Sequence, residues 1–303
     1  MKQITIIIPI YNRLNVTKEG LHYIQGSLDT YNALPEEKKK YIFDVVVVDD
    51  GSTDGSPEWI KENYPSIELI KTPGDLWWTG SANFGVSHVL KTRDNLQGIV
   101  MQNDDVVVEG DWVECMARDI SREPEALIGC ATTSPGHKDE IEFGGINTHP
   151  WFAHITHINK NRKRSEFPKG HLEPSFYLSG RGLYIPSSVF AKIGLFDQKG
   201  FKHRGDVDIP LRAKKAGYKL LVSYDAIVYE LPQHTFGLDI KKKISLKELY
   251  KAMTDFRSSY SVGYVYHYSK AATRNALQFG VFFFCNFSFH MKALLSKYFK
   301  QYI

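Results

Sequence analysis

Carboxylates gather at two places where an apolar run of the chain ends. Asp49 and Asp50 follow the run VVVV, and Asp104 and Asp105 follow GIVMQN. Two adjacent carboxylates repel each other by about 1 kcal/mol when exposed and by more where water is scarce. A hard cation, or a ribose and base that donate hydrogen bonds, would offset this repulsion. The alternative is that Asp49 and Asp50 only form a turn and cap a helix.

The elements that carry these carboxylates alternate along the chain. Apolar runs predict buried strands at residues 4–10, 43–48, 67–71 and 98–101, and helical spacing covers 16–28, 56–63 and 81–91. This alternation is typical of a parallel sheet with crossover helices, which makes the protein an α/β protein. Ligands of such sheets bind beyond the carboxyl ends of the strands. Both acidic pairs are therefore expected at one edge of one sheet.

The second half of the chain has a weaker pattern. Strands are expected at 123–134 after a helix end, at 177–185 and at 218–228, with a helix at 207–216 and a helical region from 245 onward. Residues 135–174 are polar and carry no clear periodicity. We divide the chain into a nucleotide-sugar part (1–110), a metal and acceptor part of the same domain (111–235) and a basic aromatic tail (236–303).

The familiar phosphate-binding glycine motifs are absent. The first strand is followed by Tyr11-Asn12-Arg13 rather than GxGxxG, and the chain contains no GxxxxGK[ST]. A phosphate bound here would be held most simply by a divalent metal. The oxygen-bearing triplet Asn103-Asp104-Asp105 offers the ligands that Mg²⁺ or Mn²⁺ prefers.

The ordered set of motifs resembles glycosyltransferase family 2. It comprises IIIPIYNR, VVVVDDGSTDGS, NDD, WWTGSAN, GLFD and GDVDIPLRAKKAGY, and it spans about residues 3–230. This resemblance implies the GT-A fold, with a Rossmann-like, mostly parallel central sheet flanked by helices, and inverting transfer from a nucleotide sugar. The WWTGSAN element is similar to rhamnosyltransferase-like members.

The resemblance implies a donor site at the edge of the sheet. Asp50 matches the carboxylate that bonds a uracil or thymine ring, Asp104 lies near the ribose, and Asp105 is the metal ligand. His234 is a candidate further ligand of Mn²⁺ or Mg²⁺, and its alternative is an ordinary loop residue. The other expected donor-binding residues are Pro9, Tyr11, Asn12, Trp78, Asn83 and Asn103. For Trp78, the alternative is a place in the hydrophobic core.

The resemblance also implies a catalytic base. Asp206 matches the carboxylate that takes the proton of the acceptor hydroxyl, a contribution of about 10²–10⁴-fold. Its alternative role is the N-cap of the following helix. Asp208 lies two residues on, so the two roles could be exchanged, and we assign Asp208 to the acceptor. Arg181 is expected to contact the acceptor or diphosphate, with a structural ion pair as the alternative.

The positive charge is concentrated in the tail. Residues 236–303 carry 11 Lys plus Arg against 3 Asp plus Glu, whereas the whole chain is only +4. Because the body is acidic, a nucleic-acid partner is not expected. The apolar segment 276–289 is shorter than the about 20 residues of a membrane span. It predicts an interfacial helix on an anionic membrane, a helix packed on the domain, or a homo-oligomer interface.

These observations lead to one predicted function. We expect a metal-dependent inverting glycosyltransferase that uses a UDP- or dTDP-sugar, with rhamnose as one candidate, and a glycan or lipid-linked glycan acceptor in surface polysaccharide synthesis. Three scattered cysteines and the lack of an export signal favour the cytoplasm, with the inner face of the plasma membrane as a further location. The alternatives are a non-catalytic carbohydrate-binding or scaffold protein of the same fold, and a nucleotidyltransferase.

Overall fold

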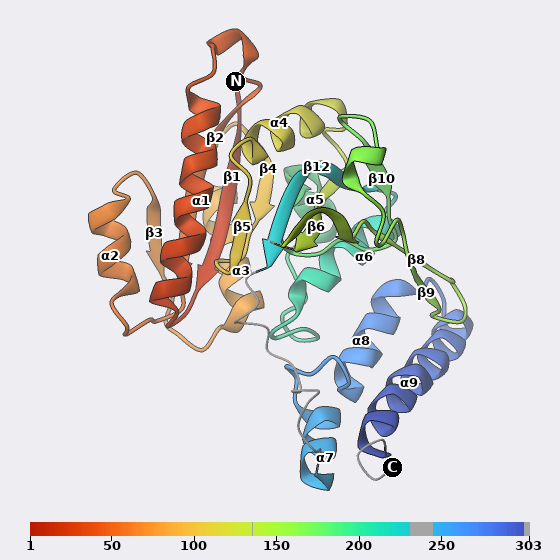
Figure 1. Cartoon of the computed structure of the whole chain (residues 1–303). Coiled ribbons are helices and arrows are strands. Elements are labelled where there is room, and N and C mark those ends of the chain that lie inside the picture. Colours follow the sequence, from red (N-terminus) through yellow and green to blue (C-terminus); the bar gives the residue numbers. More distant parts are fainter. Residues whose placement is uncertain (135, 231–244, 300–303) are drawn as a thin grey trace.

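The first half of the computed structural model is a parallel α/β layer. The structure describes residues 1–134, 136–230 and 245–299. Strands and helices alternate as β1 (Lys2–Ile10), α1 (Leu14–Asn32), β2 (Tyr41–Asp49), α2 (Ser56–Asn63), β3 (Glu68–Lys71), α3 (Trp77–Thr92) and β4 (Leu96–Met101). The strands pair in parallel in the order β4-β1-β2-β3. Ile10 lies opposite Asp49, so β1 and β2 end side by side (Figure 1).

The central strand β1 is apolar on both sides because both faces of the sheet are covered. Ile6 and Ile8 pack into a core shared with α1 and α4 (Trp112–Arg122), and Ile7 packs into a second core shared with α3. Successive side chains of a strand point to opposite faces. An unbroken apolar run is therefore what this strand requires.

The second half extends the same sheet without a break but mixes strand directions. Its elements are β5 (Val106–Val108), β6 (Leu127–Ser134), β11 (Leu183–Pro186), α5 (Ser187–Ile193), α6 (Asp208–Lys215) and β12 (Leu220–Glu230). β11 runs antiparallel between β4 and β6, whereas β12 pairs with β6 in parallel. The predicted α/β class is confirmed, and the sheet beyond β4 is mixed.

The stretch that has no clear sequence pattern folds as short strands. These are β7 (His137–Phe143), β8 (Ile146–Thr148), β9 (Ile155–His157) and β10 (Leu172–Pro174), of which β8 and β9 form a separate hairpin. The predicted strand 177–185 is wrong in its first part, because regular strand begins only at Leu183. The backbone before it turns at Gly182, where φ is +69°, a value that glycine adopts without strain.

The predicted helical tail is present as three helices beside the sheet domain (Figure 1). They are α7 (Leu246–Thr254), α8 (Val262–Ala272) and α9 (Ala276–Phe299). α9 lies along α8 with Phe282 and Asn286 buried, and the Asn286 amide donates to Ser269 Oγ over 3.3 Å. Within the described residues, α9 is the helix long and apolar enough to span a membrane, and 17% of its most apolar window is buried.

Candidate active site

The Asp50 carboxylate organises the loop that leads into α3. Its Oδ1 accepts from Thr72 Oγ1 at 2.6 Å, and its Oδ2 accepts from the backbone N–H groups of Leu76 (3.0 Å) and Trp77 (2.9 Å). Trp77 has a positive φ of 60°, which is unusual for a bulky residue. The Leu76 N–H also reaches Oδ1 at 3.2 Å, so three donors already make the about four contacts that a carboxylate accepts.

The loops after β1 and β2 are tied together beside this carboxylate. Asn12 Oδ1 accepts from the Thr53 N–H at 2.7 Å, and the Asn12 N–H donates to Ser52 Oγ at 3.0 Å. Asp49 Oδ1 accepts from the Ser52 N–H at 2.9 Å, so Asp49 forms the turn. Tyr11 is 56% exposed at the open side of this edge, next to the end of β1 that contains Pro9. The two loops thus form one wall.

The start of α3 forms a second wall. The Trp78 indole N–H donates to Asn103 Oδ1 at 3.0 Å, and its ring packs edge-on against Phe196. The Asn83 amide bonds the backbone of Phe196 in both directions, at 3.0 and 2.9 Å. Asn83 therefore fixes the segment after α5, whereas Trp78 lies directly against the acidic triplet.

The acidic pair after β4 is bridged by a cation. The Arg13 guanidinium lies 3.2 Å from Asp104 Oδ1 and 3.0 Å from Asp105 Oδ2. Asp104 is almost fully buried and also accepts from Thr17 Oγ1 at 3.0 Å. Burial raises the pKa of Asp104 to about 6, although Arg13 acts in the opposite direction. Nearby positive charge, here from Arg13, therefore helps to keep the Asp104 and Asp105 carboxylates ionised together.

This arrangement fits a divalent metal. The pair holds one cation already, and Asp105 is the more exposed of its two carboxylates. Among the residues that the structure describes, no three His, Cys, Asp or Glu side chains gather as a complete ligand set. Mg²⁺ is commonly held by one or two carboxylates together with substrate phosphates, and two carboxylates at this edge meet that requirement.

Asp206 lies in the turn before α6, and the described residues bond only one of its two carboxylate oxygens. Oδ2 accepts from the Gly180 N–H at 3.2 Å and from the Tyr177 hydroxyl at 3.3 Å, and no described residue donates to Oδ1. A side chain at Gly180 would place its Cβ 2.5 Å from the Asp206 Cβ, so this approach requires glycine. The helix cap is the wrong alternative, because Asp206 makes no capping hydrogen bond to α6.

The start of α3 contacts both the carboxylates at the ends of β2 and β4 and the segment that leads to Asp206. The Trp77 N–H bonds Asp50, the Trp78 indole bonds Asn103, and the Thr79 N–H donates to the Lys202 carbonyl at 3.3 Å. Thr79 also packs so closely on Gly205 that a Cβ there would lie 2.4 Å from its hydroxyl. One helix end thus brings together segments that lie over 150 residues apart in sequence.

The remaining predicted residues differ in their placement. Asp208 is 2% exposed and pairs with Arg212, while its Oδ2 also accepts from the Asp197 N–H. Its carboxylate is therefore committed to the protein interior rather than open to an acceptor. Arg181 is half-buried in the loop that follows Gly180. His234 lies outside the described residues.

Sequence reasoning missed three side chains at this edge. Arg13 comes soon after the predicted first strand. Its position beyond the carboxyl end of a strand could have indicated that it belongs to the site. Tyr177 donates to Asp206, and partial burial with the charge of Asp206 raises its pKa well above 10, which keeps the hydroxyl protonated. His203 packs edge-on against Trp77, and burial lowers its pKa. The last two had no signal, because their neighbours come from distant segments.

Known proteins have sequences or folds similar to this chain. N-acetylglucosaminyl-diphospho-decaprenol L-rhamnosyltransferase of Mycobacterium tuberculosis is 25% identical over 218 residues, 64% of this chain and 68% of the relative. The mannosyltransferase PcManGT of Pyrobaculum calidifontis, in complex with GDP-Man and Mn²⁺, superposes with a TM-score of 0.57 at 13% identity, over 98% of this chain and 74% of its own.

A third similar structure is residues 1–349 of TarS from S. aureus in complex with UDP-GlcNAc. Its TM-score is 0.55 at 14% identity, covering 99% of this chain and 73% of its own. These neighbours confirm the predicted GT-A fold. Residues 5–180, more than half of the chain, match the family described as glycosyl transferase family 2. The chain therefore belongs to glycosyl transferase family 2.

Proposed function

We propose that this glycosyltransferase is an inverting, metal-dependent enzyme that transfers a sugar, with L-rhamnose the leading candidate, from a UDP- or dTDP-sugar to a lipid-linked glycan. The observation that carries the proposal is the convergence of Asp50, the Asp104–Asp105 pair and Asp206 around the start of α3. A scaffold protein has no need for these three groups of charge at one edge.

The donor nucleotide lies between the two walls. The Asp50 carboxylate accepts the ring N–H of a pyrimidine in place of its longest contact, the shared one from the Leu76 N–H, and Pro9, Tyr11 and Asn12 line the base. Trp78 and Asn103 border the ribose and the sugar, next to Asp104. The order of these groups along the edge supports a diphosphate placed over Asp105.

A divalent cation would be held by Asp105, with Asp104 behind it and the donor's diphosphate completing its ligands. Such a cation acts as a Lewis acid for the departing nucleotide diphosphate. Both Mn²⁺ and Mg²⁺ suit these oxygen ligands, and His234 is retained as a candidate further ligand. Arg13 supplies positive charge at the same carboxylates, so it holds their geometry before the donor binds.

Asp206 is the general base. The Tyr177 hydroxyl and the Gly180 N–H orient one carboxylate oxygen, which leaves Oδ1 for the acceptor hydroxyl. Attack by that hydroxyl on the face opposite the leaving diphosphate inverts the anomeric centre. Arg181, in the loop that follows Gly180, is retained as a candidate contact of the acceptor or the diphosphate. The burial of Asp208 supports Asp206 rather than Asp208 in this role.

The acceptor is a sugar joined by a diphosphate to a membrane lipid. The Mycobacterium tuberculosis relative, whose name gives such an acceptor, supports this class. α9 supports it too, since its outward side carries Leu277 at 72% exposure and Phe284 at 70%. An apolar helix face flanked by lysines suits an anionic leaflet. We therefore place the enzyme at the inner face of the plasma membrane.

Calorimetry with UDP, dTDP and GDP, each with Mn²⁺ and with chelator, tests the donor site first. We expect one pyrimidine nucleotide to bind with Mn²⁺ and to bind at least about tenfold more weakly with chelator. The matching nucleotide sugar is then supplied with a prenyl-diphospho-N-acetylglucosamine, and the anomeric configuration of the product is read by NMR. Absence of binding by all three nucleotides would favour the scaffold alternative, and retained configuration would contradict the inverting mechanism.

A further inference from the structure

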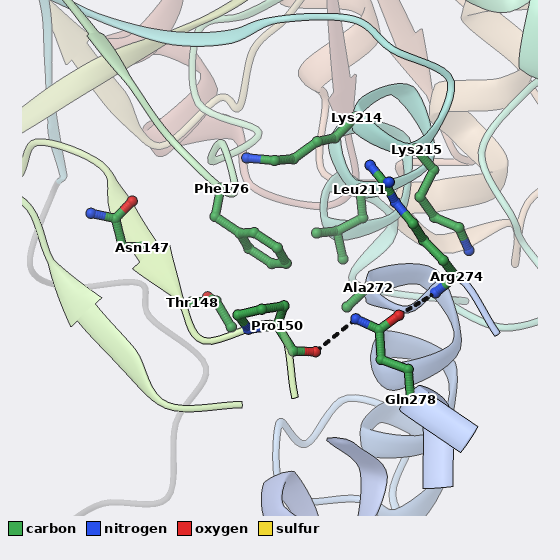
Figure 2. Close-up of a pocket in the computed structure, with 10 residues that line it drawn as sticks. All are labelled: Asn147, Thr148, Pro150, Phe176, Leu211, Lys214, Lys215, Ala272, Arg274 and Gln278. Carbon is green, nitrogen blue, oxygen red and sulfur yellow. Dashed lines mark hydrogen bonds between the residues drawn. The ribbon is translucent and has the colours of Figure 1, made fainter. Parts of the chain in front are cut away.

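A cavity of about 420 Å³ lies where α6, the start of α9 and the β8 strand meet. Three of its lining side chains, Lys214, Lys215 and Arg274, are cationic, and no carboxylate lines it. Figure 2 shows the Arg274 guanidinium reaching toward the end of α6 that carries the two lysines. The cavity floor is fixed by Gln278, whose amide donates to the Pro150 carbonyl at 2.9 Å.

The cations of this cavity are not neutralised by the described part of the chain. Lys214 Nζ donates to the Ser175 carbonyl at 3.0 Å, and Lys215 Nζ donates to the Lys270 carbonyl at 3.1 Å. Within residues 1–134, 136–230 and 245–299, no Asp or Glu forms an ion pair with Lys214, Lys215 or Arg274. Burial lowers the pKa of both lysines, and Lys270, Arg212 and Arg274 lower that of Lys215 further. Like charges held together in this way favour an anion.

The cavity also shares two segments with the catalytic edge. Phe176 lines it, and the next residue, Tyr177, donates to Asp206. Leu211 lines it from α6, the helix that begins two residues after Asp206. Lys214 lies six residues after the start of α6, about 9 Å along the helix at about 1.5 Å per residue, so a ligand of a few linked groups could extend from one place to the other.

We propose that Lys214, Lys215 and Arg274 form a phosphate site that holds the diphosphate of the lipid-linked acceptor. The identification of that diphosphate as the acceptor's rests on the proposed function. Phosphate oxygens accept charge-assisted hydrogen bonds from lysine and arginine. In a prenyl-diphospho-sugar the diphosphate adjoins the sugar directly, so a phosphate site on α6, the helix that begins two residues after Asp206, would limit which sugar hydroxyl reaches the base.

The first test is the binding of inorganic pyrophosphate, measured by calorimetry on the whole chain in chelator. The chelator removes any metal that could hold pyrophosphate at Asp105. We expect the wild type to bind, and the Lys215→Gln/Arg274→Gln variant to bind at least about tenfold more weakly. The control, Lys61→Gln/Lys91→Gln, removes two exposed charges elsewhere and leaves affinity unchanged. No binding by the wild type, or equal affinity in both double variants, overturns the site.

A second variant guards against a folding defect. Lys215 and Arg274 are exposed, so their loss should leave the thermal unfolding midpoint unchanged. Lys214→Met keeps a side chain of similar length but removes the ammonium group, which lies over the Phe176 ring and donates to the Ser175 carbonyl. It should weaken pyrophosphate binding as well, and unchanged binding in this variant would remove Lys214 from the site.

Binding to vesicles distinguishes two possible sources of the bound phosphate, the acceptor's diphosphate and a phospholipid headgroup. Phosphatidylcholine vesicles are prepared with a prenyl diphosphate or, at matched negative charge, with phosphatidylglycerol. We expect tighter binding to the prenyl diphosphate, and loss of this preference in Lys215→Gln/Arg274→Gln. Equal binding to both vesicles would assign the cavity to phospholipid headgroups and overturn the acceptor diphosphate. Neither assay needs donor, metal or turnover, so failure of sugar transfer would leave the pyrophosphate result standing and would count only against the proposed function.

Discussion

At the scale of single residues, the open oxygen of Asp206 leads to the first prediction. Asp206→Asn keeps the shape and the Gly180 bond but cannot accept the acceptor's proton. We expect sugar transfer to fall by about 10²–10⁴-fold, with nucleotide affinity unchanged by calorimetry. Asp94→Asn, an exposed change at the far end of β4, serves as the control. Transfer at the wild-type rate in Asp206→Asn would remove it as the base.

Asp104 provides a second prediction at this scale, on stability against pH. The pKa of the Asp104 carboxyl is about 6 in the folded protein, whereas its unperturbed value, expected in the unfolded chain, is 3.8. Between pH 3.8 and about 6 the folded protein therefore binds more protons than the unfolded chain does. Stability then falls as pH rises through this window. Asp104→Asn should therefore gain stability from about pH 4 upward, reaching about 1–3 kcal/mol above pH 6.

Denaturant unfolding of both proteins in chelator, from about pH 4 to about pH 8, measures this gain. Chelator is needed because a metal bound to the pair would lower the pKa of Asp104 and hide the effect. A gain that does not change with pH would show that burial of the charge is not its cause.

At the scale of elements, the loop between β3 and α3 is held by one buried carboxylate. Thr72 bonds Asp50 but is not among the proposed nucleotide contacts. Thr72→Val removes that 2.6 Å hydrogen bond and keeps the side-chain shape. A buried hydrogen bond contributes about 1 kcal/mol, so we expect nucleotide affinity to fall by about 3–10-fold through a loosened start of α3.

Thr30→Val is the matched control for this change. Thr30 is exposed on α1 and bonds only within its own helix, to the Gly26 carbonyl. Calorimetry with the same nucleotide should show no change in this variant. If Thr72→Val also binds normally, Asp50 acts on the nucleotide without any contribution from the loop.

At the scale of the whole molecule, α9 is apolar on the side that faces away from the protein. Positions spaced three, four or seven residues apart form this outward stripe, which contains Leu277, Val281, Phe284, Met291, Leu295 and Phe299. Phe282, Asn286 and Leu294 occupy the opposite side and are buried. A helix with apolar residues on both sides needs a second apolar environment, which the proposed membrane surface supplies.

This stripe leads to a prediction for membrane binding. Phe284→Gln/Leu295→Gln should reduce sedimentation with phosphatidylglycerol vesicles by about tenfold or more, because each large apolar side chain contributes about 1.5–3 kcal/mol when buried. Ile42→Gln/Leu90→Gln, which changes two exposed apolar residues elsewhere, should bind as the wild type does. An equal loss of vesicle binding in both variants would contradict a membrane role for α9. So would analytical ultracentrifugation that shows a dimer in the wild type and only monomer in Phe284→Gln/Leu295→Gln.

The amino-acid sequence by itself determined the parallel half of the fold and the identity of the acidic residues. Strands buried on both faces must be continuously apolar, so residues 4–10 and 43–48 were recognisable without any neighbour. The end of the run 43–48 then placed Asp50, and the end of the run 98–101 placed Asp104 and Asp105, at one sheet edge. Local patterns carry this information because strand burial and strand ends are local properties.

Only the tertiary structure decided how these residues are used. The insertion of β11 between β4 and β6, the Arg13 bridge, and the bonds from Tyr177 and Gly180 to Asp206 all join distant segments. A hydrogen-bond partner or a shared cavity depends on three-dimensional packing rather than on spacing along the chain. For the same reason the cationic cavity between α6 and α9 left no trace in the sequence, since its lining residues stand over 100 positions apart.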